Sequence, residues 1–110
     1  HYIAFPSSFV EPEVARSYNL QRSRYMAIVN ISVLDNKNQD KAQNVSITGS
    51  ARNLLGQTKS LSFKKVKEGD AIYYLAQVKY RDQETLNFNI QVQRGDRIEN
   101  LKFTKKLYVD

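Results

Sequence analysis

Few residues in this chain could perform chemistry. The chain has one histidine, His1, and no cysteine. A serine or threonine nucleophile needs a base within hydrogen-bond reach, and a lone histidine at the start of the chain is poorly placed to serve as one. The lack of cysteine excludes disulfides, thiol catalysis and cysteine-ligated zinc or iron–sulfur sites. The sequence therefore argues against a nucleophilic catalytic triad.

Two other chemistries stay open as alternatives. An N-terminal histidine can bind copper, so His1 allows a metal or small-ligand carrier, although Cu(II) prefers further nitrogen donors and no second histidine exists. Paired carboxylates could perform acid–base chemistry, which allows a carboxylate-dependent enzyme as the third hypothesis. Most acidic residues fall in expected turns, where they serve turn geometry: Glu11, Glu13, Asp35, Asp40, Glu68, Asp70, Asp82 and Glu84. We therefore expect no enzymatic activity, no cofactor and no bound metal.

The most distinctive polar group combines arginines with tyrosines in the first quarter of the chain. Its members are Arg16, Tyr18, Arg22, Arg24 and Tyr25. Arginine pairs with carboxylates through two hydrogen bonds and stacks on tyrosine rings. As a functional group it would form an interaction surface at one end of the fold. The alternative, which the residue types favour, is a structural clamp that ties a helix to the sheet.

The net charge of +6 permits binding to an acidic protein, an anionic surface or nucleic acid. Several cations could form a basic patch: Lys59, Lys64, Lys65, Lys67, Arg94, Arg97, Lys102, Lys105 and Lys106. Nucleic-acid binding usually combines such charge with exposed aromatic rings, whereas the aromatic residues here follow the period of a core. Nucleic acid is therefore not expected as a partner, and an acidic protein or anionic surface is favoured over it.

The segment that organises the fold is Ala71–Tyr80. In an extended strand, Ile72, Tyr74 and Val78 share one face, and the first half of the other face is apolar as well. A strand of this kind belongs in the middle of a sheet. Further strands are expected at 2–5, 22–34, 44–53, 59–67, 85–93 and 98–109. Pro12–Tyr18 has a helical period and would form the only helix, since Pro12 suits a first helical position.

Short turns should join these strands. Residues 35–41 form a polar loop, 68–70 a tight reversal and 94–97 a glycine-centred hairpin. Gly49 is suited to a close backbone approach, and Gly56 to a positive φ at the end of a strand. Leu54 and Leu55 are too apolar for an exposed turn, so at least one of them should fold back onto the core.

These elements predict a single all-β domain. About seven strands joined by short turns are typical of a two-sheet, immunoglobulin-like antiparallel β-sandwich, here with one short N-terminal helix. The chain lacks the cysteines and the tryptophan of an immunoglobulin domain, so the likeness is architectural. An open barrel of similar strand number is the alternative. No apolar run approaches the roughly 20 residues of a transmembrane helix.

Several segments taken together resemble a known family. They are His1–Phe5, Pro12–Tyr18, Arg22–Arg24, Ala51–Gly56, Ile72–Leu75 and Leu107–Asp110. In these segments, which span nearly the whole chain, it resembles the gammaproteobacterial domain-of-unknown-function family 4426. The resemblance implies a small exported protein whose signal peptide has been removed, and therefore a periplasmic location. The family brings no established activity or catalytic residues.

We therefore expect a periplasmic, non-catalytic binding or accessory module that engages an as yet unidentified protein partner. The candidate interaction surface is the group of five arginines and tyrosines described above. The sequence leaves the oligomeric state open.

Overall fold

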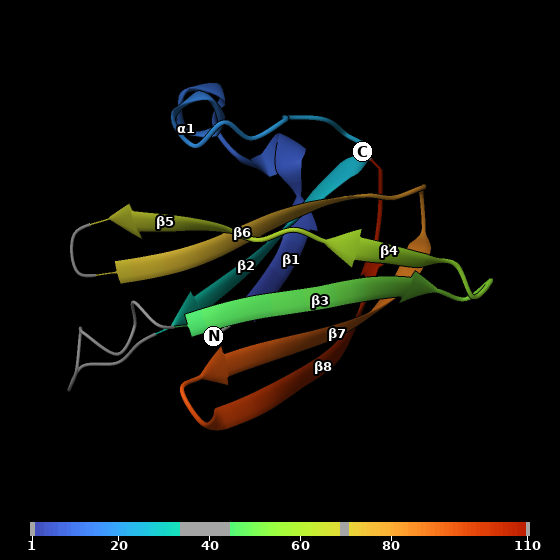
Figure 1. The fold of residues 1–110 in the computed structure, drawn as a ribbon. Helices are drawn as coiled ribbons and strands as arrows, with labels where there is room; N and C mark the ends of the chain where they lie inside the picture. Colours follow the sequence, from blue (N-terminus) through green and yellow to red (C-terminus); the bar gives the residue numbers. More distant parts are fainter. Residues whose placement is uncertain (1, 34–44, 69–70, 110) are drawn as a thin grey trace.

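The computed structural model describes residues 2–33, 45–68 and 71–109, and these form two antiparallel four-stranded sheets packed face to face (Figure 1). Sheet A has the strand order β1-β2-β6-β5 and sheet B has the order β4-β3-β7-β8. The strands of sheet A are β1 (Tyr2–Pro6), β2 (Met26–Val33), β5 (Lys64–Glu68) and β6 (Ala71–Lys79). The strands of sheet B are β3 (Val45–Asn53), β4 (Thr58–Leu61), β7 (Glu84–Arg94) and β8 (Arg97–Leu107). The predicted β-sandwich is confirmed.

The main core lies between the two sheets. Strand β6 runs between β2 and β5, as expected for the strand that organises the fold. It buries Ile72, Tyr74 and Val78 toward sheet B. Strand β7 supplies the facing row, and its buried side chains alternate with exposed amides as the sequence predicts: Leu86, Phe88, Ile90 and Val92.

A third layer covers the outer face of sheet A. It consists of the helix α1 (Pro12–Ser17), a short 3-10 helix η1 (Ser7–Phe9) and the segment that leads into β2 (Figure 1). Beneath it, Ile28, Val66 and Leu75 are buried in a second apolar cluster. This cover explains why the first half of β6 is apolar on both faces. The 3-10 helix adds one helical turn to the single helix that was expected.

Hydrogen bonds between side chains and backbone hold the covering layer together and fasten it to the sheet. The buried Ser7 hydroxyl donates to the Ser23 carbonyl at 2.8 Å and accepts the Ser23 N–H at 2.8 Å. The Gln77 side-chain amide forms a similar pair with the Gln21 backbone, at 3.0 and 2.6 Å. Because residues 18–25 belong to this layer, β2 begins at Met26 and not at Arg22 as expected.

The single strand expected at 59–67 is two strands in different sheets. Strand β4 pairs with β3 in sheet B, and β5 pairs with β6 in sheet A. The alternation of buried residues explains this correction. Leu61 and Phe63 pack into the main core, whereas Val66 is out of phase with them and packs under the helical layer. The switch between sheets closes this side of the sandwich.

Stacked aromatic rings close the opposite side, where β1 faces β8. The Tyr2 ring stacks on Phe103 with centroids 4.5 Å apart, and Phe103 stacks on the buried Phe88 at 4.7 Å. Offset stacking at such separations is the favourable geometry for aromatic pairs. The stack joins sheet A to sheet B, although these edge strands exchange no ladder hydrogen bonds.

The glycine predictions hold, but the leucine prediction for the β3–β4 turn is wrong. A Cβ on Gly49 would lie 3.0 Å from Ile90 Cγ1, and Gly56 has a φ of +86°. Leu54 and Leu55 both point into solvent, with exposed fractions of 76% and 85%. Asn53 occupies the buried position instead, because it satisfies the backbone of the turn with its side chain. The hairpin at 94–97 is confirmed, whereas residues 35–41 and the reversal at 69–70 lie outside the described residues.

Candidate functional site

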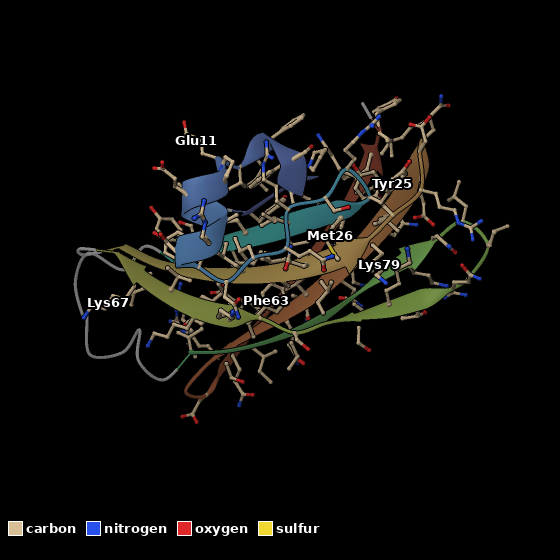
Figure 2. All side chains as sticks on the ribbon, turned by 90° about the horizontal axis from the view of Figure 1, so that it is seen from above. Glu11, Tyr25, Met26, Phe63, Lys67 and Lys79 are labelled. Carbon is tan, nitrogen blue, oxygen red and sulfur yellow. The ribbon has the colours of Figure 1, made fainter. Side chains whose placement is uncertain are left out.

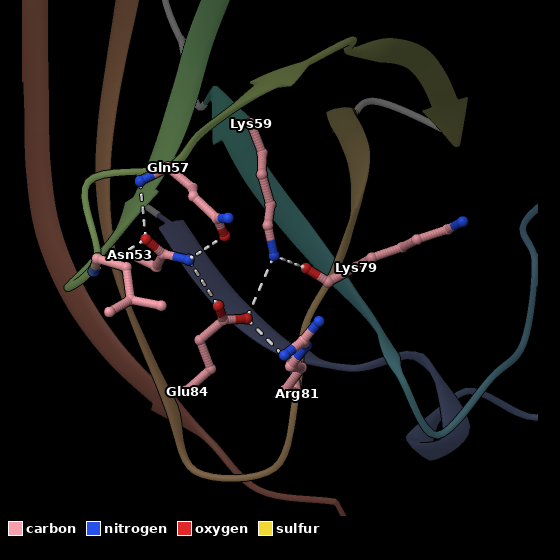
Figure 3. A network of polar contacts seen from close by, with 7 residues as sticks. Asn53, Gln57, Lys59, Lys79, Arg81 and Glu84 are labelled. Atoms are coloured by element: carbon pink, nitrogen blue, oxygen red, sulfur yellow. Dashed lines mark hydrogen bonds and ion pairs between the residues drawn. The ribbon is translucent and has the colours of Figure 1, made fainter.

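A polar network joins the two sheets at the end of the sandwich where β3, β6 and β8 end (Figure 3). Asn53 Nδ2 donates to Glu84 Oε2 at 3.0 Å and to Gln57 Oε1 at 2.9 Å. Lys59 Nζ forms an ion pair with Glu84 Oε1 at 3.2 Å. The same ammonium donates to the Lys79 carbonyl at 2.5 Å, so sheet B is tied to the last residue of β6.

Glu84 is held in its ionised form by this network. Burial raises the pKa of its carboxyl, but hydrogen bonds from Asn53, from the Arg81 N–H and from Lys59 outweigh burial and hold the pKa below its usual value. Both carboxylate oxygens accept hydrogen bonds from these donors. The network thereby fixes the β3–β4 turn and the β6–β7 turn next to a cleft.

The cleft lies beside the network and has a volume of about 420 Å³. The segment that leads into β2, the start of β4 and the end of β6 contribute its lining residues: Gln21, Ser23, Tyr25, Met26, Lys59, Lys79, Tyr80 and Arg81. The Tyr80 N–H donates to the Tyr25 carbonyl at 2.9 Å, which fixes the wall that carries the exposed Tyr25 ring. Figure 2 labels Tyr25, Met26 and Lys79, which lie near one another in that view.

The lining combines apolar surface with positive charge. Tyr25 offers an exposed aromatic ring, and the largely buried Met26 adds its thioether to the wall of the cleft. Lys59, Lys79 and Arg81 add three cations, and the lining holds no carboxylate. Lys59 is paired with Glu84, whereas the Lys79 and Arg81 side chains are exposed. This chemistry suits an apolar group that stands beside an acidic one.

The structure separates the five residues of the predicted interaction surface. Arg22 is a clamp: its Nε donates to the Val10 carbonyl at 2.7 Å and its Nη2 to the Ser8 carbonyl at 3.1 Å. Tyr18 ends the helix α1 and packs into the apolar cluster beneath it. The alternative interpretation, a clamp between the helical layer and the sheet, therefore describes Tyr18, whereas the bonds of Arg22 hold the covering layer itself together.

The remaining three residues are exposed, and they are divided between the helix α1 and the turn before β2. Arg16 lies on α1 in a shallow hollow of about 320 Å³ with Glu13 and Ser17. Arg24 is exposed in the turn before β2, and Tyr25 lines the cleft. Tyr25 is thus the one predicted site residue that the structure places in the cleft.

Sequence reasoning missed the partners of Tyr25 in this cleft. Lys79 and Arg81 flank Tyr80 at the end of the predicted central strand. Outward lysine and arginine side chains at such a position usually indicate only exposure to solvent. Their relation to Tyr25 depends on the pairing of β2 with β6, in which Met26 lies opposite Lys79. A correct pairing of these two strands is the signal that could have found them.

The metal site considered from the sequence can be compared with the described part of the chain. Within residues 2–33, 45–68 and 71–109, no group of three or more His, Cys, Asp or Glu side chains is arranged to hold a metal ion. His1, Asp35, Asp40 and Asp70 lie outside these residues. In the same described ranges, no helix is long and apolar enough to cross a membrane.

The fold and the cleft define the class as an all-β sandwich with a helical cover and a cation-lined cleft at one end. The family model Domain of unknown function (DUF4426) matches residues 1–110, so the chain belongs to this family and the resemblance seen in the sequence is confirmed. The chain is similar to a DUF4426 family protein from Pseudomonas aeruginosa whose crystal structure is solved. The sequence identity is 34%, the TM-score is 0.82, and the likeness covers 100% of this chain and 87% of that chain. A comparison with curated proteins gives no match.

Proposed function

We propose that this protein is a non-catalytic binding module of the periplasm that engages a protein partner through the cleft. The observation that carries this proposal is the cleft lining, which places the Tyr25 ring and Met26 beside Lys79 and Arg81 without a carboxylate. Aromatic, methionine and arginine side chains are enriched in protein interfaces. The partner would present an apolar side chain next to aspartate or glutamate.

The interactions of the two carboxylates in the β6–β7 turn region, Asp82 and Glu84, support a non-catalytic role. A carboxylate that acts as general acid or base needs free access to a substrate proton. Glu84 instead accepts hydrogen bonds on both oxygens, and Asp82 Oδ1 accepts the Val109 N–H at 2.9 Å. Glu84 thereby supports the backbone of the turn between β6 and β7, and Asp82 ties this turn to the segment that follows β8.

The periplasmic location rests on two supports. The family resemblance implies an exported protein, and the relative with a solved structure comes from a Gram-negative bacterium. A metal or small-ligand carrier is the second candidate function. Native mass spectrometry of the chain purified from its own host separates the two, since a carrier retains additional mass and a transient binding module does not.

Site-specific photocrosslinking tests the proposal. Tyr25 is replaced by the photoreactive residue benzoylphenylalanine, and intact cells are irradiated. Ile98 is the matched control, since it is an exposed apolar residue at the opposite end of β8. We expect a discrete protein adduct from position 25 and none from position 98.

Charge reversal then identifies the chemistry of the partner. Lys79→Glu combined with Arg81→Glu should reduce the adduct from position 25 by about tenfold or more, because like charges now face the acidic partner. Both side chains are exposed, so folding should be preserved. Equal adduct yields from positions 25 and 98 would contradict a protein-binding cleft. An adduct yield from position 25 that is unchanged by the two charge reversals would contradict it as well.

A further inference from the structure

The turn between β3 and β4 presents two leucines to solvent. Leu54 and Leu55 have exposed fractions of 76% and 85%, the highest among the large apolar side chains of the described residues. Single exposed apolar residues are ordinary, but two neighbours at the tip of a turn form a compact apolar point. In Figure 1 this turn extends past the strand ends at the right-hand side of the molecule.

The exposure of the leucines is fixed by the structure of the turn. Asn53 Oδ1 accepts the Leu55 N–H at 3.1 Å and the Gln57 N–H at 2.9 Å. The backbone adds bonds from Asn53 N–H to the Gln57 carbonyl and from Gly56 N–H to the Asn53 carbonyl, at 3.0 and 3.1 Å. Glu84 anchors the buried Asn53 amide from β7. The turn therefore holds both leucines outward.

Basic side chains lie against the leucine turn and at the neighbouring strand ends. A Cβ on Gly56 would lie 3.5 Å from Arg52 Nη2, so this guanidinium lies against the turn. Arg81, Lys105 and Lys106 are exposed at the same strand ends, since β8 there pairs with the start of β7. The described carboxylates at this end are Asp82 and Glu84, and Lys59 neutralises Glu84. The end of sheet B is thus positively charged.

An exposed tyrosine completes the surface. Tyr108 follows β8 and is half exposed, and Lys106 Nζ lies 5.5 Å from the centroid of its ring. Tyrosine is enriched at membrane–water interfaces because its ring is apolar and its hydroxyl is polar. Leucine, tyrosine and basic side chains therefore share one end of the sandwich.

From this arrangement we infer that the leucine turn docks the protein onto the surface of an anionic phospholipid bilayer. Leu54 and Leu55 enter the interface, Arg52 contacts lipid phosphates beside the turn, and the exposed Lys105 and Lys106 at the end of β8 add to the attraction toward the anionic surface. A lipid surface is favoured over a protein pocket by the shape of the turn. A convex tip with two leucines cannot supply the roughly 800 Å² per partner of a specific protein interface, whereas fluid lipid surrounds such a tip without a preformed pocket.

Tryptophan fluorescence tests this inference directly, because the chain contains no tryptophan. Leu55→Trp places a single reporter at the tip, and Ile98→Trp places one on an exposed apolar position at the other end of β8. Each variant is mixed with vesicles of equal parts phosphatidylglycerol and phosphatidylcholine. We expect a blue shift and quenching by brominated lipid for Leu55→Trp only. Added salt should reverse the binding, since counterions screen the cations.

A second pair of variants measures the contribution of the leucines. Leu54→Asn combined with Leu55→Asn should lower the vesicle partition coefficient of the protein about tenfold or more, because the transfer of two leucines from water is lost. Both side chains are exposed, so an unchanged circular dichroism spectrum and melting curve are expected. The matched control is Ile98→Asn, which should leave the partition coefficient unchanged.

Four outcomes would overturn the inference. The first is an unshifted Leu55→Trp spectrum with anionic vesicles, and the second is an equal shift from Ile98→Trp. The third is equal binding to vesicles of phosphatidylcholine alone. A Leu55→Trp shift that appears only with membrane-free periplasmic extract would also refute it and assign the turn to a protein. These readouts do not involve Tyr25, so the proposed cleft and the lipid surface can fail separately.

Discussion

Replacing Asn53 by aspartate should reverse how stability depends on pH at the sheet-joining network. The introduced aspartate keeps the oxygen that accepts the Leu55 and Gln57 N–H groups. It replaces the donor that reaches Glu84 Oε2 at 3.0 Å and Gln57 Oε1 at 2.9 Å by a second oxygen. The change is nearly isosteric, so packing is preserved and only donors and charge differ.

The magnitude follows from the lost donors and the new repulsion. Two hydrogen bonds disappear, at about 0.5–1.5 kcal/mol each. The two carboxylates now meet at hydrogen-bond distance, which adds about 2 kcal/mol after Lys59 offsets part of the repulsion. We expect the free energy of unfolding of Asn53→Asp to be about 3–5 kcal/mol lower than that of the parent protein at neutral pH. The melting temperature should then fall by about 12 °C or more.

The pH dependence supplies the decisive sign. In the parent protein the folded pKa of Glu84 lies below its unfolded value, so its stabilisation is present at neutral pH and is lost as pH falls through the folded pKa. In Asn53→Asp the carboxylate pair raises the folded pKa of one member. The folded variant then binds more protons than its unfolded chain. The difference in free energy of unfolding between the parent and the variant therefore becomes smaller as the pH falls toward about 4.

Urea unfolding of the parent and the variant across this pH range measures both effects. The control is Asn53→Asp combined with Glu84→Gln, in which the introduced glutamine amide can donate to the introduced aspartate. This double variant should recover about half of the lost free energy of unfolding at neutral pH. Its stability relative to the parent should not increase further as the pH is lowered. If the Asn53→Asp deficit is absent at neutral pH, or is the same at all pH values, the network does not have the role assigned to it.

Other sites give further predictions. Gly49→Ala should cost about 1–3 kcal/mol in thermal unfolding, because its Cβ would press on Ile90 and on backbone; no loss would mean that the strands separate easily. Arg22→Ala should cost about 1–2 kcal/mol and speed hydrogen exchange in the helical layer alone, since it frees two carbonyls. Phe103→Ala should cost about 3–4 kcal/mol, because the ring joins Tyr2 to the core. An unchanged melting curve would contradict that role.

The fold was largely predictable because period and burial coincide in most strands. Strand β7 alternates between apolar and amide residues without a break, and the central strand β6 has the apolar residues that an interior position requires. The segment 59–67 was the hardest to predict, because the alternation of its buried residues shifts by one position between β4 and β5. Val66 is out of step with Leu61 and Phe63, but a single residue out of phase reads as noise until the second apolar layer is known.

The candidate site was less predictable, because its residues meet through pairing of distant strands. Tyr25 and Arg81 are far apart in the sequence and line one cleft through the β2–β6 pairing. Hydrophobicity also misled the prediction for Leu54 and Leu55. Composition favours their burial, whereas the outcome depended on Asn53, whose side chain can satisfy a turn and be buried at a strand end.

The network at this end supports both proposed surfaces. Lys59 connects Glu84 to the Lys79 carbonyl at the cleft, and the same Glu84 anchors Asn53 under the leucine turn. A substitution in the network therefore disturbs the cleft and the turn together and cannot assign a role to either. Surface substitutions can, because the side chains of Lys79 and Leu55 lie outside these side-chain contacts. If charge reversal at the cleft removes the crosslink while lipid binding persists, the two surfaces act independently on one rigid frame.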